Sequence, residues 1–80
     1  MTTNDAVARR ISKLLREKKM TMYRLERNSG LVPGAVDRIM NRKNKTVTLT
    51  TVYKLARGFG MTFHEFLDDD VFRSDEIEID

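Results

Sequence analysis

The sequence predicts a compact all-α domain of five short helices, and three observations support this fold class. Apolar residues recur at the spacing of three and four residues that is typical of amphipathic helices. Residues that favour helix ends, which are Asp, Thr, Pro and Gly, stand at the borders of these periodic segments. No segment within residues 5–67 alternates as a half-buried strand does. A length of 80 residues supports a single domain.

The first helix is expected to run from Asp5, as its N-cap, to about Lys19. Its apolar stripe comprises Val7, Ile11, Leu14 and Leu15. Four cations fall largely off this stripe, and we expect them to be exposed: Arg9, Arg10, Lys13 and Arg16.

A helix-turn-helix unit is expected next. Thr21 is a suitable N-cap for a helix that ends at about Asn28, and Gly30 stands in the turn that follows. Pro33 suits the first position of a helix that runs to Asn41, because proline is well tolerated there. Two short helices joined by a glycine-containing turn have the spacing of a helix-turn-helix.

The last two helices follow a polar, basic loop over residues 41–46. Thr48 is the expected N-cap of the fourth helix, and Gly60 is expected just beyond its end. The apolar positions of this helix are Leu49, Val52, Leu55, Ala56 and Phe59. Thr62 and Glu65 have the form of a capping box, so a fifth helix should run to Leu67.

The net charge of +3 is the sum of two opposed halves. Residues 1–45 contain 12 Lys or Arg and 4 Asp or Glu, whereas residues 46–80 contain 3 and 8. The excess of positive charge in residues 1–45 indicates a surface that binds a polyanion. The alternative is an uneven charge distribution on a surface that contacts only solvent. We expect the acidic tail over residues 68–80 to be mostly disordered, with a short edge strand as the alternative.

Several classes of protein are not expected. The chain has no cysteine for a disulfide, and its single histidine, His64, has no neighbouring ligands that suggest a metal site or another cofactor. No set of residues for nucleophilic or acid–base catalysis can be assembled, so an enzyme is not expected. The lack of a long apolar run and of a signal-peptide pattern favours a soluble, cytoplasmic protein.

Two stretches of the chain carry a resemblance to a known family. The first, across the helix-turn-helix unit, contains Leu25, Gly30, Val36, Ile39 and Asn41, and the second covers residues 48–67. Together they resemble the lambda-repressor-like helix-turn-helix family of Cro and phage repressors, the XRE family. The resemblance implies a DNA-binding domain at residues 5–67, followed by the acidic tail. It also implies a sequence-specific regulator of transcription, of the repressor kind, that binds double-stranded DNA as a dimer.

The resemblance also implies roles for individual positions. The recognition helix, from Pro33 to Asn41, is expected in the major groove, and the positions that face base edges are Pro33, Gly34, Asp37 and Arg38. Contacts with DNA phosphates are expected from Thr21, Met22, Asn41, Arg42, Lys43 and Lys45.

The chain departs from the usual pattern at three positions. Family members often have a glutamine, a small residue and a polar cap where this chain has Met22, Glu26 and Val32. Because Pro33 and Gly34 offer no side-chain donor, Arg38 is expected to be the main base reader, through a bidentate contact with guanine. The alternatives are that Arg38 binds a phosphate or an acid on its own helix. Gly34 and Ala35 are weaker candidates for contact with a thymine methyl group.

The fifth helix and the tail offer candidate interaction surfaces. Dimer contacts are expected there, from Phe63, Phe66, Val71 and Phe72. The alternative function is a protein-binding module, such as an antitoxin, whose acidic tail binds a partner protein through Val71, Phe72, Ile77 and Ile79. We also expect the tail to compete with DNA for the basic face of the domain.

Overall fold

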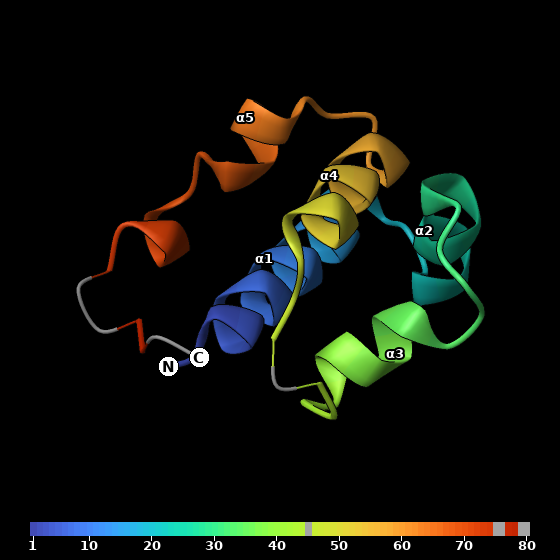
Figure 1. The fold of residues 1–80 in the computed structure, drawn as a ribbon. Coiled ribbons are helices and arrows are strands. Elements are labelled where there is room, and N and C mark those ends of the chain that lie inside the picture. Colours follow the sequence, from blue (N-terminus) through green and yellow to red (C-terminus); the bar gives the residue numbers. More distant parts are fainter. Residues whose placement is uncertain (45, 75–76, 79–80) are drawn as a thin grey trace.

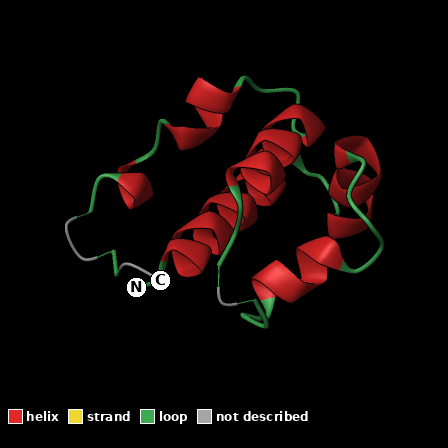
Figure 2. Ribbon diagram, in the orientation of Figure 1, coloured by secondary structure: helices red, strands yellow, loops and turns green. Residues whose placement is uncertain are grey.

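The computed structural model of the chain describes residues 1–44, 46–74 and 77–78. These residues form five α-helices and one 3-10 turn (Figures 1 and 2), which are α1 (Thr3–Lys18), α2 (Met22–Ser29), α3 (Ala35–Met40), α4 (Leu49–Gly58), α5 (Phe63–Leu67) and η1 (Asp70–Phe72). Helix α2 packs against α3 and α4, α1 packs against α3 and η1, and α5 packs against α4. The predicted all-α, five-helix fold with a helix-turn-helix at α2 and α3 is confirmed.

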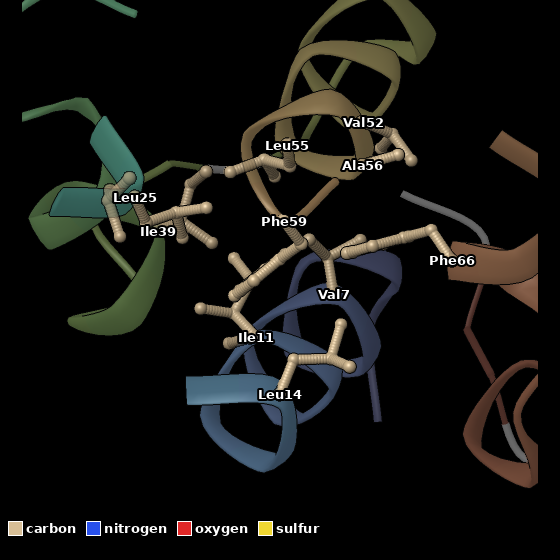
Figure 3. Packing of buried hydrophobic residues seen from close by; sticks show 12 residues of the cluster. Val7, Ile11, Leu14, Leu25, Ile39, Val52, Leu55, Ala56, Phe59 and Phe66 are labelled. Atoms are coloured by element: carbon tan, nitrogen blue, oxygen red, sulfur yellow. The ribbon is translucent and has the colours of Figure 1, made fainter. Parts of the chain in front are cut away.

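All five helices share one hydrophobic core. Each contributes a side chain that is at most 1% exposed, namely Ile11, Leu25, Ile39, Leu55 and Phe66. Figure 3 shows these side chains between the ribbons of the helices. Helices of 5 to 16 residues are marginal in isolation, so their stability comes from this shared burial.

Most of the predicted helix ends are confirmed. The hydroxyl groups of Thr21, Thr48 and Thr62 each accept a hydrogen bond from the backbone three residues later. Gly30 and Gly60 follow α2 and α4 in the left-handed conformation, at φ +70° and +73°.

The predicted start of α1 is wrong by one turn. Its N-cap is Thr2, and Asp5 occupies the third position of the helix. The two residues form a capping box in which the Asp5 amide donates to Thr2 Oγ1 at 3.1 Å and the Thr2 amide donates to Asp5 Oδ2 at 3.0 Å.

A close approach of α2 and α4 fixes the relative position of these helices. Gly58 is buried at the end of α4, and a Cβ atom there would overlap Ser29 Oγ and lie 3.1 Å from the carbonyl oxygen of Leu25. Asn28 Nδ2 donates to the Gly58 carbonyl at 3.4 Å across the same contact. The absence of a side chain at Gly58 therefore lets the two backbones meet.

Two expected exposures are reversed. Arg10 is only 7% exposed, because its guanidinium donates to the carbonyl groups of Phe66 at 2.7 Å and Glu65 at 2.9 Å. These carbonyls lie at the end of α5, where a helix leaves its acceptors without partners. Leu49, predicted on the apolar stripe of α4, is instead 71% exposed at the first position of that helix.

The first part of the acidic tail is folded, contrary to expectation. Asp69 accepts hydrogen bonds from Arg10 Nη1 at 3.1 Å, Lys13 Nζ at 2.9 Å and the Val71 amide at 2.9 Å. The ring of Phe72 lies 6.0 Å from that of Phe66, centroid to centroid. Residues 68–74 are therefore held on α1 and α5.

The expected edge strand is reduced to one isolated parallel bridge in the described residues, between Thr2 and Glu78. Among the expected tail anchors, Ile79 lies outside the described residues.

We predict that Asp69→Asn lowers the unfolding free energy by about 1–2 kcal/mol at pH 7, because it removes the charge that Arg10 and Lys13 bind. The Val71 amide and the Lys13 ammonium hold the pKa of Asp69 below its ordinary value. A lowered folded-state pKa stabilises the fold above the unfolded-state pKa of about 3.9, and this contribution disappears as the pH falls through the folded-state pKa. The difference between wild type and variant should therefore close below about pH 4.

Urea unfolding between pH 2 and 7 measures this difference. Asp70→Asn, at a neighbouring aspartate whose side chain is 98% exposed, is the control and should leave the acid dependence unchanged. A difference between wild type and Asp69→Asn that stays constant over the whole range contradicts the assignment.

Candidate nucleic-acid interface

The turn between α2 and α3 has a geometry that the sequence analysis missed. The Ala35 amide donates to the Val32 carbonyl at 3.1 Å, and Gly34 has φ +85° and ψ −6°. This is a type II turn with Pro33 and Gly34 at its two central positions, and glycine is favoured at the second of them. The predicted start of the helix at Pro33 is therefore wrong, because α3 begins at Ala35. The Pro-Gly dipeptide itself is a turn signal.

Glu26 caps α3 from the neighbouring helix. Its Oε1 accepts from the Gly34 amide at 2.9 Å and its Oε2 accepts from the Val36 amide at 3.1 Å. Gly34 has no side chain to perform this role. One carboxylate on α2 therefore satisfies two of the amides at the start of α3 and complements the positive end of its dipole.

The other end of α3 is fixed to α1. Asn4, which is only 2% exposed, donates from Nδ2 to the carbonyl group of Ile39 at 3.2 Å. Arg42, in the left-handed conformation after α3, donates from Nε to Asp5 Oδ1 at 2.8 Å. Hydrogen bonds from Thr2 and from Arg42 hold the pKa of Asp5 below its ordinary value. The short helix is thus held at both ends.

Arg38 is exposed and free of acidic partners. It forms no ion pair with any residue in the described ranges, so the expected alternative of an acid on its own helix is not seen. A Cβ atom at Gly34 would lie 3.3 Å from Arg38 Nη1. The guanidinium therefore lies beside the turn at the start of α3.

Asp37 and Asn41 lie together on the exposed side of α3. Asn41 Nδ2 donates to Asp37 Oδ1 at 2.8 Å and to the Asp37 carbonyl at 3.0 Å. A residue expected to face a base and one expected to face a phosphate are thus hydrogen-bonded to each other.

The cations after α3 differ in whether they form an ion pair within the chain. Arg42 is tied to Asp5, whereas the exposed Lys43 has no ion pair within the described part of the chain. Lys45 lies outside the described residues.

An open hollow of about 460 Å³ lies between the end of α1 and the start of α2. Four cations line it, none of them predicted as a DNA contact, and no carboxylate is among the described residues around it: the cations are Lys18, Lys19, Arg24 and Arg27. Thr21, one of the expected phosphate contacts, lies on its rim, and Met22 at the start of α2 is 40% exposed. In the sequence, this basic surface is indicated only by the high density of Lys and Arg in residues 1–45.

The expected dimer residues are exposed to different extents. Phe66 is fully buried in the core of this chain and offers no surface to a partner. Phe63, Val71 and Phe72 are half-buried, and the Phe63 ring lies 5.9 Å from that of Tyr53 in an edge-to-face contact.

The acidic groups of the tail bind the chain itself. Asp69 pairs with Arg10 and Lys13, and Arg73 pairs with Asp68 and Asp70. For residues 68–74, the described contacts therefore do not support competition of the tail with DNA for the surface around α3.

Two helices joined by a tight turn, with one side of the second exposed beside cations that form no ion pair within the described residues, have the arrangement of a helix-turn-helix unit. The family model of the Cro/C1-type HTH DNA-binding domain matches residues 10–70, and the chain belongs to this family. The expected resemblance is confirmed, and the chain is of a class of DNA-binding transcription regulators. A search of curated proteins and one of solved structures found no match. Every helix of the described residues is too short or too polar to cross a membrane.

We predict that Glu26→Ala lowers the unfolding free energy by about 1–2 kcal/mol, because two amides at the start of α3 lose their acceptor. Glu17→Ala, the same change at an exposed position of α1, should have little effect. Chemical denaturation of both variants measures the difference. Equal stability of the two variants would show that the Glu26 carboxylate does not cap α3.

Proposed function

We propose that the protein is a sequence-specific regulator of transcription, of the repressor kind, that binds double-stranded DNA as a dimer with α3 in the major groove. The observation that carries this proposal is the pairing pattern of the cations around α2 and α3. Arg38, Lys43 and the four cations of the α1–α2 hollow form no ion pair in the described residues. Such a surface is suited to a polyanion.

In this proposal the exposed side of α3 reads bases. Arg38 is long enough to reach beyond the turn, and its guanidinium matches the O6 and N7 acceptors of guanine. Asp37 accepts from cytosine N4 in the same groove, and Pro33 and Gly34 approach the base edges with no side-chain donor.

The surrounding residues bind phosphates. Thr21 and Met22 present the start of α2, where backbone amides and the helix dipole favour an anion. After α3, phosphates are bound by Asn41, Lys43 and Lys45. Arg42 also binds a phosphate and keeps its ion pair with Asp5. The hollow between α1 and α2 extends this contact along the DNA backbone.

The division into a DNA-binding domain at residues 5–67 and a tail at 68–80 stays a prediction, as does a protein partner for that tail. Phe72 packs on Phe66, which leaves fewer apolar side chains of the tail available to a partner. Selection of genomic fragments by the purified chain, followed by footprinting, tests the proposed function. Failure to enrich any fragment contradicts it.

We predict that Arg38→Ala weakens binding to the selected site by about 1–3 kcal/mol and relaxes base preference at one position. Binding to random DNA should change much less. Fluorescence anisotropy with both DNAs measures the effect. Arg38→Lys, which keeps the charge but loses the guanidinium fork, should also lose the preference. Equal losses on selected and random DNA exclude Arg38 as a base reader.

We predict that Lys43→Ala weakens binding to every DNA sequence, because a phosphate contact carries no sequence information. The slope of log K against log salt concentration should become shallower by about one. Titrations at several salt concentrations give this slope. Lys54→Ala, at an exposed lysine of α4, is the matched control and should leave it unchanged. An unchanged slope for Lys43→Ala rules out the phosphate contact.

A further inference from the structure

The exposed surface at the start of α3 is apolar. Val32 is 63% exposed, and Pro33 beside it is exposed as well. Ala35 is only 9% exposed and belongs to the core, so it offers little surface to a ligand. The apolar group at the tip of the recognition unit is therefore the pair Val32 and Pro33.

The polar groups at this tip are already engaged. Glu26 accepts from the amides of Gly34 and Val36, and the Ala35 amide donates to the Val32 carbonyl. Three successive amides, which would otherwise attract an anion, thus have partners. The negative charge of Glu26 further disfavours a phosphate at this place. What remains for recognition here is contact with an apolar group.

We propose that Val32 and Pro33 read thymine through its C5-methyl group, an inference that rests on the proposed function of α3 in the major groove. The thymine methyl is the apolar group that the major groove presents, while the other base edges offer donors and acceptors. Arg38 Nη1 lies beside Gly34, the residue after Pro33. The chain therefore places an apolar contact next to a guanidinium, and it reads a thymine close to a guanine in each half-site.

The test uses the full chain and a binding site selected from a random pool of double-stranded DNA. In this site each thymine is replaced, one at a time, by deoxyuridine, which pairs in the same way but lacks the C5-methyl group. One thymine in each half-site should show a loss of affinity of about fourfold, the value of one buried methyl group. In Val32→Ala the same replacement should have a clearly smaller effect, because only Pro33 still contacts the methyl group.

Val32 is exposed, so Val32→Ala should fold normally, and circular dichroism checks this. Leu49→Ala removes another exposed aliphatic side chain and should keep the full deoxyuridine effect. An enriched site whose affinity is indifferent to deoxyuridine overturns the inference but leaves the proposed function intact. A deoxyuridine effect that is undiminished in Val32→Ala also overturns it. A pool that yields no enriched site contradicts the proposed function itself, and with it this inference.

Discussion

The carboxylate of Glu26 is the contact on which the arrangement of the recognition unit depends. It accepts from the amides of Gly34 and Val36 across the gap between α2 and α3. A helix of six residues supplies little stability of its own, so its orientation is set by the burial of Val36 and Ile39 and by the contacts that hold its ends. Glu26 holds the first end and Asn4 the second. Both contacts are made with backbone groups of the α3 region, so they leave the exposed side chains of α3 free to face the solvent.

This capping arrangement involves two of the three departures from the usual family pattern, at positions 26 and 32. A polar cap at position 32 is replaced by Val32, and a small residue at position 26 is replaced by Glu26. Because the Glu26 carboxylate caps α3 at Gly34, the start of this helix needs no polar side chain at position 32. As a consequence, position 32 is free to present an apolar side chain to the solvent and, in the proposed function, to DNA.

Over the described residues, the structure separates the cations that form ion pairs from those that do not, a distinction that the sequence does not show. Arg10, Lys13 and Arg73 are bound by the tail carboxylates, and Arg42 is bound by Asp5. Among the cations without an ion pair in the described ranges, Arg38 and Lys43 lie at α3 and four line the α1–α2 hollow, while Arg9 and Arg16 lie on α1 and Lys54 and Arg57 on α4. The folded part of the acidic tail thus pairs with Arg10 and Lys13 on α1 and leaves the charge around α2 and α3 exposed.

Sequence reasoning succeeded at most of the local signals and missed the contacts between distant residues. Two local signals were also misread, the Pro33-Gly34 turn and the Thr2–Asp5 capping box. The caps at Thr21, Thr48 and Thr62 act within three residues, so they could be predicted. Arg10 is buried by a carbonyl group 56 positions away, and Asp69 orders the tail through partners on α1 at the other end of the chain. Neither contact corresponds to a periodic pattern in the sequence from which it could be predicted. The start of α3 was misplaced although Pro33-Gly34 is a turn signal, and its cap, Glu26, lies eight residues before Gly34 on another helix.

The central claim is that α3, fixed by Glu26, reads the major groove. Protection of a selected site from dimethyl sulfate tests it directly, because this reagent methylates guanine N7 in the major groove and adenine N3 in the minor groove. The account predicts protection of guanine N7 in two half-sites about one helical turn apart, lost in Arg38→Ala. Protection confined to adenine N3, or guanine protection that persists in Arg38→Ala, would contradict it.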